Sequence, residues 1–120
     1  MARILVVDDS TTMRQMVSFT LSEAGHEVTE AVDGQHALAE AKARRYDLVI
    51  TDVNMPVMNG IDLVKSLRAI PEFKFIPILV LTTEAGPDLK NRGREAGATG
   101  WIVKPFSPDV LIATLRKVLD

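Results

Sequence analysis

The chain contains no cysteine. Disulfide bonds, thiolate metal sites and cysteine nucleophiles are therefore excluded, and we expect a reducing compartment, the cytoplasm. Long hydrophobic runs are missing as well, because the longest, residues 4–7 and 78–81, fall far below the ~18 residues that a membrane span requires. The first run does not suit a signal peptide either, since Asp8 and Asp9 end it at once. We therefore expect no association with membranes.

An excess of charge of one sign is also absent. The 14 Lys and Arg residues against 16 Asp and Glu give a net charge of −2 over 120 residues. The basic residues are scattered, except for Lys90, Arg92 and Arg94. Non-specific nucleic-acid binding needs a clustered basic surface, so nucleic acid is not an expected partner. The length suits a single domain with one core.

The sequence does contain a regular alternation of two patterns. Bursts rich in valine and isoleucine predict strands at residues 3–7, 48–51, 77–81 and 101–103, with a weaker one at 28–32. Stretches of helical period predict helices between them, near residues 11–24, 34–45, 60–69 and 87–96, and a last helix that begins at Pro108 and includes Val118. Strands that alternate with helices predict an α/β fold, in which a parallel sheet is covered on both faces.

Two of these helices carry further expectations. The first should bury Met13, Met16, Val17 and Leu21 on the side that faces the sheet. The helix at 87–96 has Gly93 in its interior and little apolar surface. We therefore expect this helix to pack loosely.

Polar side chains follow the predicted strands at the points where the strands end. In an open parallel sheet the ligand crevice lies beyond these carboxyl ends. Crowded carboxylates repel one another, and an all-oxygen donor set suits Mg²⁺, which often shares its shell with a phosphate. A lysine there can neutralise the phosphate, a threonine can donate a hydroxyl, and an aspartate can act as a nucleophile that forms an acyl phosphate. The residues at the strand ends are Asp8, Asp9, Asp52, Thr82, Thr83 and Lys104.

Each of these residues also has an ordinary structural explanation. Asp8 and Asp9 before Ser10 are typical of a helix N-cap, and Asp52 before a proline-containing loop is typical of a turn. Lys104 is compatible with a solvated loop, and Thr82 with a strand. Taken singly, the structural explanations are favoured. The joint arrival of these residues at the ends of four strands favours a functional site instead.

Four sequence blocks resemble the response-regulator receiver domains of two-component signalling. They are VVDDS at 6–10, ITDVNMPVMNG at 50–60, LTT at 81–83 and VKPF at 103–106. The resemblance covers the whole chain, which within this family is most similar to the stand-alone chemotaxis regulators. It implies a doubly wound, flavodoxin-like sheet with strand order 2-1-3-4-5 and five helices. It also implies that residues 1–120 form one receiver domain, without an output domain.

The resemblance implies roles for the residues at the strand ends. Asp52 matches the phosphoacceptor, which receives a phosphoryl group from a histidine of a sensor kinase. Asp9 matches a direct Mg²⁺ ligand and Asp8 an acid that acts largely through water, while Asn54 matches a ligand that uses its backbone carbonyl. Asp52 completes this implied magnesium site. Lys104 matches the lysine that contacts the phosphoryl oxygens.

Further positions match the switch of the family. Thr82 corresponds to the hydroxyl that moves toward the phosphoryl group, and Trp101 to the switch aromatic, which is more often tyrosine or phenylalanine. Asn54 and Glu84 correspond to the positions that tune the lifetime of the phosphoryl group. The bond between Lys104 and Pro105 is usually cis in the family. We expect Trp101 to be partly exposed, because strand 101–103 should lie at the sheet edge.

The function that the resemblance implies is a phosphorylation-activated signalling switch. Such a protein is a phosphoacceptor that assists its own phosphorylation and dephosphorylation, and is not an enzyme in the usual sense. The implied partners are a chemotaxis-type histidine kinase and a flagellar motor switch protein or a phosphatase, and the protein is expected to be a monomer. The alternative within the family is a single-domain phosphorelay intermediate that passes its phosphoryl group to a histidine phosphotransfer protein.

A Mg²⁺-dependent aspartyl phosphatase of the haloacid-dehalogenase kind is an alternative of another class. That class also phosphorylates an aspartate after a strand, but it needs a second aspartate two positions further along. Asn54 stands two positions after Asp52, and Ser10 two positions after Asp8. The sequence also lacks the glycine-rich loops of nucleotide-binding proteins. Neither class is therefore favoured.

Overall fold

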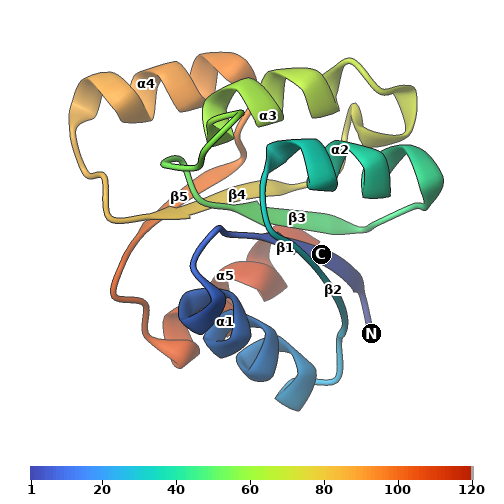
Figure 1. Cartoon of the computed structure of the whole chain (residues 1–120). Coiled ribbons are helices and arrows are strands. Elements are labelled where there is room, and N and C mark those ends of the chain that lie inside the picture. Colours follow the sequence, from blue (N-terminus) through green and yellow to red (C-terminus); the bar gives the residue numbers. More distant parts are fainter. Residues whose placement is uncertain (120) are drawn as a thin grey trace.

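The computed structural model describes residues 1–119, and its centre is a parallel sheet with helices on both faces (Figure 1). The sheet has 5 strands, hydrogen-bonded in the order β2-β1-β3-β4-β5. The predicted fold class and strand order are therefore confirmed. The strands are β1 (Arg3–Val7), β2 (Glu27–Ala31), β3 (Leu48–Thr51), β4 (Ile78–Thr82) and β5 (Gly100–Val103).

The helices divide between the two faces of the sheet. Figure 1 shows α1 and α5 on one face, and α2, α3 and α4 on the other. Within residues 1–119, no helix is long and apolar enough to cross a membrane. The helices are α1 (Thr11–Glu23), α2 (Gly34–Ala43), α3 (Gly60–Arg68), α4 (Pro87–Ala96) and α5 (Pro108–Leu119), and a short 3₁₀ helix, η1 (Pro71–Phe73), follows α3.

The sheet separates two hydrophobic clusters because successive side chains of a strand point to opposite faces. In β1, Ile4 and Val6 pack with buried residues of α1 and α5, whereas Leu5 and Val7 pack with those of α2 and α3. Every residue of β3 and of β4 is buried. Burial on both faces explains why these strands show continuous apolar runs in the sequence.

Local signals fix where several helices begin and end. The side chains of Ser10, Asp33 and Asn59 accept hydrogen bonds from the backbone N–H groups at the starts of α1, α2 and α3. Gly25 follows α1 and Gly97 ends α4, and both have positive φ angles, 90° and 113°. Capping side chains therefore mark the starts of three helices, and glycines mark the ends of two.

Some expectations for the helices and strands are corrected by the structure. Met16 is 50% exposed, whereas Val17 and Leu21 are buried as predicted and Met13 is half-buried. Met16 points away from the sheet because neighbouring helical residues differ by about 100° in direction. The helix predicted at 34–45 ends at Ala43. The strands predicted at 28–32 and 77–81 are shifted by one residue from β2 and β4, and the strand predicted at 101–103 and the helix predicted at 60–69 differ from β5 and α3 by one residue at one end.

Candidate functional site

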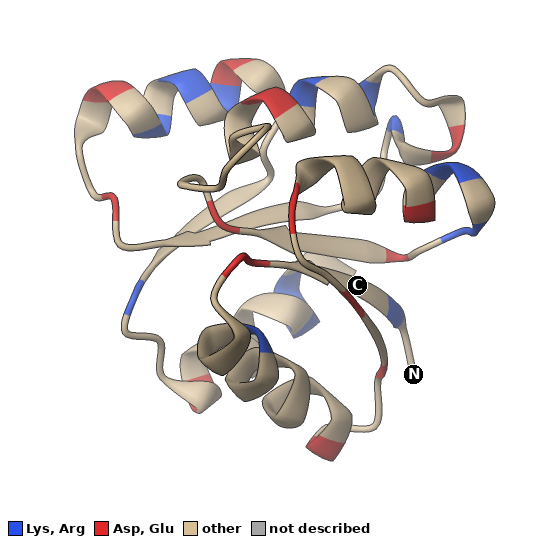
Figure 2. Cartoon of the chain, in the orientation of Figure 1, with Lys and Arg blue, Asp and Glu red and all other residues tan. Residues whose placement is uncertain are grey.

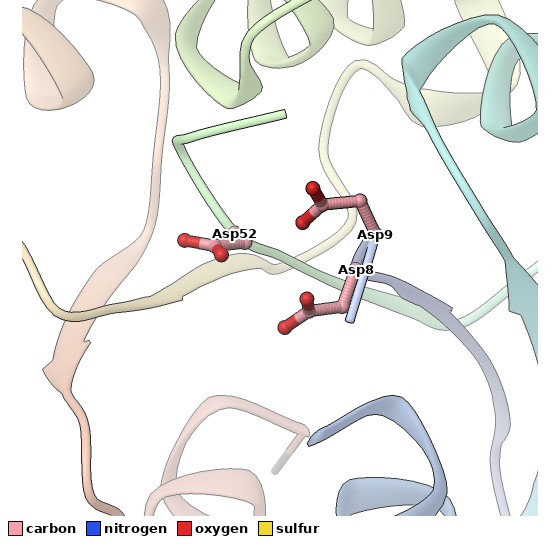
Figure 3. Close-up of side chains that lie close together, drawn as sticks. All are labelled: Asp8, Asp9 and Asp52. Carbon is pink, nitrogen blue, oxygen red and sulfur yellow. The ribbon is translucent and has the colours of Figure 1, made fainter. Parts of the chain in front are cut away.

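Three carboxylates converge at the carboxyl ends of β1 and β3 (Figure 3). Asp8 and Asp52 are 3% and 9% exposed, while Asp9 is exposed to solvent. One oxygen from each of the three carboxylates lies within 4.8 Å of the oxygens from the other two. The pairing of Val7 with Thr51 in the parallel register explains why the following aspartates become neighbours. The arrangement is one that could hold a metal ion.

Lys104 joins two of these carboxylates. Its Nζ donates hydrogen bonds to Asp8 Oδ2 at 2.8 Å and to Asp52 Oδ2 at 3.1 Å. The side chain of Lys104 is only 8% exposed. Burial disfavours the charged ammonium, but the hydrogen bonds and the two negative charges outweigh burial, so the pKa of Lys104 lies above its ordinary value. The lysine therefore stays charged and offsets part of the repulsion in the cluster.

Backbone contacts hold the two buried aspartates in place. Asp8 Oδ1 accepts a hydrogen bond from Ser10 N at 2.9 Å, and Asp52 Oδ1 accepts one from Val53 N at 2.7 Å. The guanidinium of Arg14 donates to the Asp8 carbonyl at 2.8 Å. Sequence reasoning missed Arg14, because a hydrogen bond to a backbone carbonyl leaves no pattern in the sequence.

Gly60 was also missed as a residue of the site. A Cβ atom at this position would collide with the carbonyl oxygen of Asp52. The N–H of Gly60 donates to the carbonyl of Val53 at 2.9 Å. The first turn of α3 therefore lies directly against the backbone of Asp52, which requires a residue without a side chain.

Glu84 connects several of the remaining predicted residues. Its carboxylate accepts a hydrogen bond from the Asn54 side chain at 2.8 Å, and its carbonyl accepts one from Trp101 Nε1 at 2.8 Å. The N–H of Glu84 donates to the hydroxyl of Thr82 at 3.3 Å. Thr82 is fully buried, and Thr83 is exposed and lies outside this group.

Trp101 is half-buried at the sheet edge, as predicted, and packs against α4. A Cβ atom on Gly93 would lie 2.6 Å from Cζ3 of the indole. The interior glycine of α4 therefore makes room for the tryptophan. The peptide bond between Lys104 and Pro105 is cis, as the resemblance implied.

The clustered basic residues Lys90, Arg92 and Arg94 lie on α4, where Figure 2 shows basic segments along the helix. A groove of about 360 Å³ lies between α4 and β5, and its lining includes Lys90, Arg94 and Trp101. Arg92 is exposed on the same helix. Trp101 thus lies beside the basic side chains of α4.

Comparisons with known proteins agree with this architecture. Residues 4–116 match the family model described as response regulator receiver domain. Chemotaxis protein CheY1 of Helicobacter pylori strain J99 is 48% identical over 119 residues, which are 98% of this chain and 96% of that protein. The crystallised chemotaxis protein CheY4 of Vibrio cholerae is 55% identical, covers 99% of both chains and superposes with a TM-score of 0.96.

A further similar structure contains a metal. It is the receiver domain of the sensor histidine kinase PA1611 from Pseudomonas aeruginosa, with a magnesium ion coordinated in its active site cleft. It is 28% identical, with a TM-score of 0.92, and covers 98% of this chain and 97% of that one.

Proposed function

The chain belongs to the response regulator receiver domain family, and from that membership we propose that it is a phosphorylation-activated signalling switch of the chemotaxis type. Asp52 is the phosphoacceptor, and a chemotaxis-type histidine kinase is the donor. The observation that carries this proposal is the contact of the buried Lys104 ammonium with both Asp8 and Asp52, at 2.8 and 3.1 Å. A fixed positive charge beside a nucleophilic carboxylate suits the transfer of an anionic phosphoryl group.

The residues of the site divide the work of this transfer. An oxygen of the Asp52 carboxylate forms a bond to phosphorus while the bond from phosphorus to the donor histidine nitrogen breaks, and the imidazole leaves with the electron pair. Lys104 moves its hydrogen bonds from the carboxylates toward the phosphoryl oxygens. Thr82, whose hydroxyl contacts only the Glu84 N–H among the residues described, turns toward the same oxygens.

A magnesium ion fits the residues that surround Asp52. The donor set is all oxygen, and one ammonium leaves the three carboxylates with an excess of negative charge. Asp8, Asp9 and Asp52 would hold the ion together with the backbone carbonyl of Asn54. When bound, Mg²⁺ neutralises charge on the phosphoryl group. The magnesium in the related PA1611 receiver domain supports this assignment.

The output is a change in affinity for a protein partner. Thr82 and Trp101 both hydrogen-bond to Glu84, at 3.3 and 2.8 Å, so a movement of Thr82 alters the surroundings of the indole. The groove between α4 and β5 with Lys90 and Arg94 would then receive an acidic segment of the partner. The partner is a flagellar motor switch protein or a phosphatase. The chain acts as a single receiver domain, a monomer in the cytoplasm, and Asn54 and Glu84 tune the phosphoryl lifetime.

Phosphorylation by a small donor tests the assignment of Asp52. Acetyl phosphate with Mg²⁺ should add one phosphoryl group to the wild type, detected by intact mass spectrometry and lost in base. The Asp52→Asn variant should take up none. Asp62→Asn, a change on the exposed side of α3, is the matched control and should behave as the wild type does. Equal base-labile uptake by Asp52→Asn would show that another residue is the nucleophile.

Transfer from the phosphorylated protein separates the chemotaxis role from a phosphorelay role. The phosphorylated form should bind a flagellar switch protein more tightly than the unmodified form does. Passage of the phosphoryl group to a histidine phosphotransfer domain, without a gain in binding to the switch protein, would contradict the chemotaxis role.

A further inference from the structure

Arg68, the last residue of α3, hydrogen-bonds to three separate segments, to two of them through backbone carbonyl groups and to the third through a hydroxyl group. Its Nε and Nη2 donate to the carbonyl of Gly97, at 3.0 and 2.7 Å. Its Nη1 donates to the carbonyls of Phe73 and Ile76, at 2.8 and 2.7 Å. Further hydrogen bonds reach the carbonyl of Lys74 and the hydroxyl of Thr99, at 3.3 and 3.4 Å. One side chain thus joins α3 to the end of α4, to the loop before β4 and to the entry into β5.

These contacts differ from those of an ordinary ion pair. Within residues 1–119, the structure gives Arg68 no carboxylate partner, although the guanidinium is partly buried. Burial lowers the pKa of Arg68, but an arginine remains protonated in proteins. Its positive charge is stabilised by the dipoles of the carbonyl groups that accept its hydrogen bonds. One of these carbonyls belongs to Gly97 at the carboxyl end of α4, which is the negative end of the helix dipole. The guanidinium of Arg68, a residue of α3, therefore caps the carboxyl end of α4.

The opposite end of α3 touches the phosphoacceptor. Gly60, its first residue, lies against the carbonyl of Asp52 and hydrogen-bonds to that of Val53 at 2.9 Å. Between the two ends, Ile61, Leu63, Val64 and Leu67 are buried. A packed helix of 9 residues spans about 13 Å, and because packed interiors are hardly compressible, it can transmit a displacement from one end to the other.

The two ends of α4 are held differently. Its carboxyl end is fixed by Arg68 through Gly97, at 2.7 Å. At its amino end, Gly86 provides no side-chain cap and is exposed. A change in the position of this helix would therefore be largest near Gly86, close to Glu84 and the indole of Trp101.

We propose that Arg68 is a positioning residue of the switch: α3 links the backbone of Asp52 to the carboxyl end of α4 and the entry of β5, with Arg68 as the connection. This inference rests on the proposed function, because it concerns how phosphorylation at Asp52 reaches the α4–β5 surface. The link is separate from the contacts of Thr82 and Trp101 with Glu84. It fixes one end of α4, so that the response to Asp52 is concentrated at the other end.

Removing the guanidinium tests this link in the full chain. In Arg68→Met, amide exchange measured by mass spectrometry should rise about tenfold in the carboxyl half of α4, since hydrogen bonds to a charged group are lost. Beryllofluoride with Mg²⁺ should still bind with wild-type affinity, measured by calorimetry, because Arg68 has no hydrogen bond to the acidic cluster. The change in Trp101 emission on binding should fall to half or less of the wild-type change. Arg92→Met, which removes an exposed arginine of α4, is the matched control and should leave the amide exchange, the affinity and the emission change as in the wild type.

A milder variant and a pair of glycine variants separate positioning from stability. Arg68→Lys keeps the charge but cannot donate to Gly97 and to the 73–76 loop at once, so it should also lose the emission response. Gly97→Ala should reproduce the effect, because a Cβ there would lie 2.9 Å from Arg68 Cγ. Gly25→Ala imposes the same backbone conflict at a site with nothing within 4 Å and should leave the response intact.

Three outcomes are informative. A full emission response in Arg68→Lys or Arg68→Met, with unchanged exchange in α4, would overturn the positioning role. Equal loss of response in Gly25→Ala and Gly97→Ala would show that general destabilisation is the cause, and would overturn it as well. If the wild type binds beryllofluoride without a change in Trp101 emission, the proposed function itself is contradicted.

Discussion

At the scale of single residues, Lys104 supplies the positive charge that reduces the repulsion between the buried carboxylates of the acidic cluster. Its ammonium lies 2.8 Å from Asp8 and 3.1 Å from Asp52, and all three side chains are largely buried. Two buried carboxylates without this partner would repel each other and remain poorly solvated. The lysine therefore has a structural role before any phosphoryl group arrives.

The Lys104→Met variant should reveal that role. Without metal it should be less stable than the wild type by about 3 kcal/mol, because two buried carboxylates lose their counter-charge. Mg²⁺ should recover more of the stability in the variant than in the wild type, since the variant's cluster is more negative. Thermal melting with chelator and with Mg²⁺ measures both effects. Lys65→Met on the exposed side of α3 is the control, and equal metal-free melting of all three proteins would contradict the prediction.

Val57 shows a second effect of a single residue. It lies in the loop between β3 and α3 with a φ of 72°, and its side chain is 73% exposed. A β-branched residue in this left-handed region is strained, and the exposed side chain gains little from packing.

Asparagine tolerates the left-handed region better than valine does, so Val57→Asn should stabilise the protein by about 1 kcal/mol. The midpoint of thermal unfolding should rise by several degrees. Val110→Asn makes the same exchange on α5, where valine is 52% exposed and the two residues have similar helix propensities. That control should shift the midpoint little, and an equal shift in both variants would mean that backbone strain at Val57 is not the cause.

At the scale of the elements, α4 combines a weak helix sequence with a defined contact. Gly93 in its interior lowers helix propensity. The indole of Trp101 occupies the space that a side chain at Gly93 would take. The helix is therefore adapted to its neighbour on β5. This contact adds to the packing of Leu89 and Ala96 into the core and to the hydrogen bond from Arg68 to Gly97 at 2.7 Å.

Replacing Gly93 with alanine tests which of these effects is larger. Helix propensity alone predicts stabilisation by about 1 kcal/mol. We expect the collision with the indole to dominate, so that Trp101 moves toward solvent and its fluorescence emission shifts to longer wavelength. Gly86→Ala at the open start of the helix, where a Cβ meets nothing within 4 Å, should leave the emission unchanged. A more stable Gly93→Ala protein with unaltered emission would refute the role of this contact.

At the scale of the whole molecule, the acidic cluster and the start of the chain lie at opposite ends of the strands. The acidic cluster follows the carboxyl ends of the strands, whereas His26 precedes β2 and its Nδ1 accepts a hydrogen bond from Ala2 N at 3.0 Å. Burial and the positive amino terminus lower the pKa of His26 below its ordinary value. Folding therefore favours the neutral ring, which alone can accept this hydrogen bond.

The sign of the resulting pH dependence follows from linkage. The unfolded chain takes up a proton at His26 as the pH falls through about 6.5, before the folded chain does. Stability is therefore complete above that pH and decreases as the pH falls toward the lower folded pKa. Denaturant unfolding at pH 7.5 and at pH 5 should show a larger decrease for the wild type than for His26→Gln. Identical decreases in the wild type and in His26→Gln would contradict the assignment.

Much of the fold and of the candidate site could be predicted from the sequence. The apolar bursts located the strands, because strands buried on both faces must be apolar throughout. The positions of Asp8, Asp52 and Lys104 directly after strands were enough to bring them together, since the ends of parallel strands meet at one edge. Their positions at the ends of parallel strands therefore placed them at the same edge of the sheet.

Other features were decided only by the tertiary structure. Arg68 and Arg14 bind backbone carbonyls, and every residue has a carbonyl, so no residue type marks their partners. The sequence presented Gly93 as a defect in a helix, and only the approach of Trp101 from another strand made it a contact. The exposure of Met16 likewise depended on how α1 is rotated on the sheet. Periodicity and strand ends act locally or through sheet geometry, whereas these contacts depend on how separate elements approach one another.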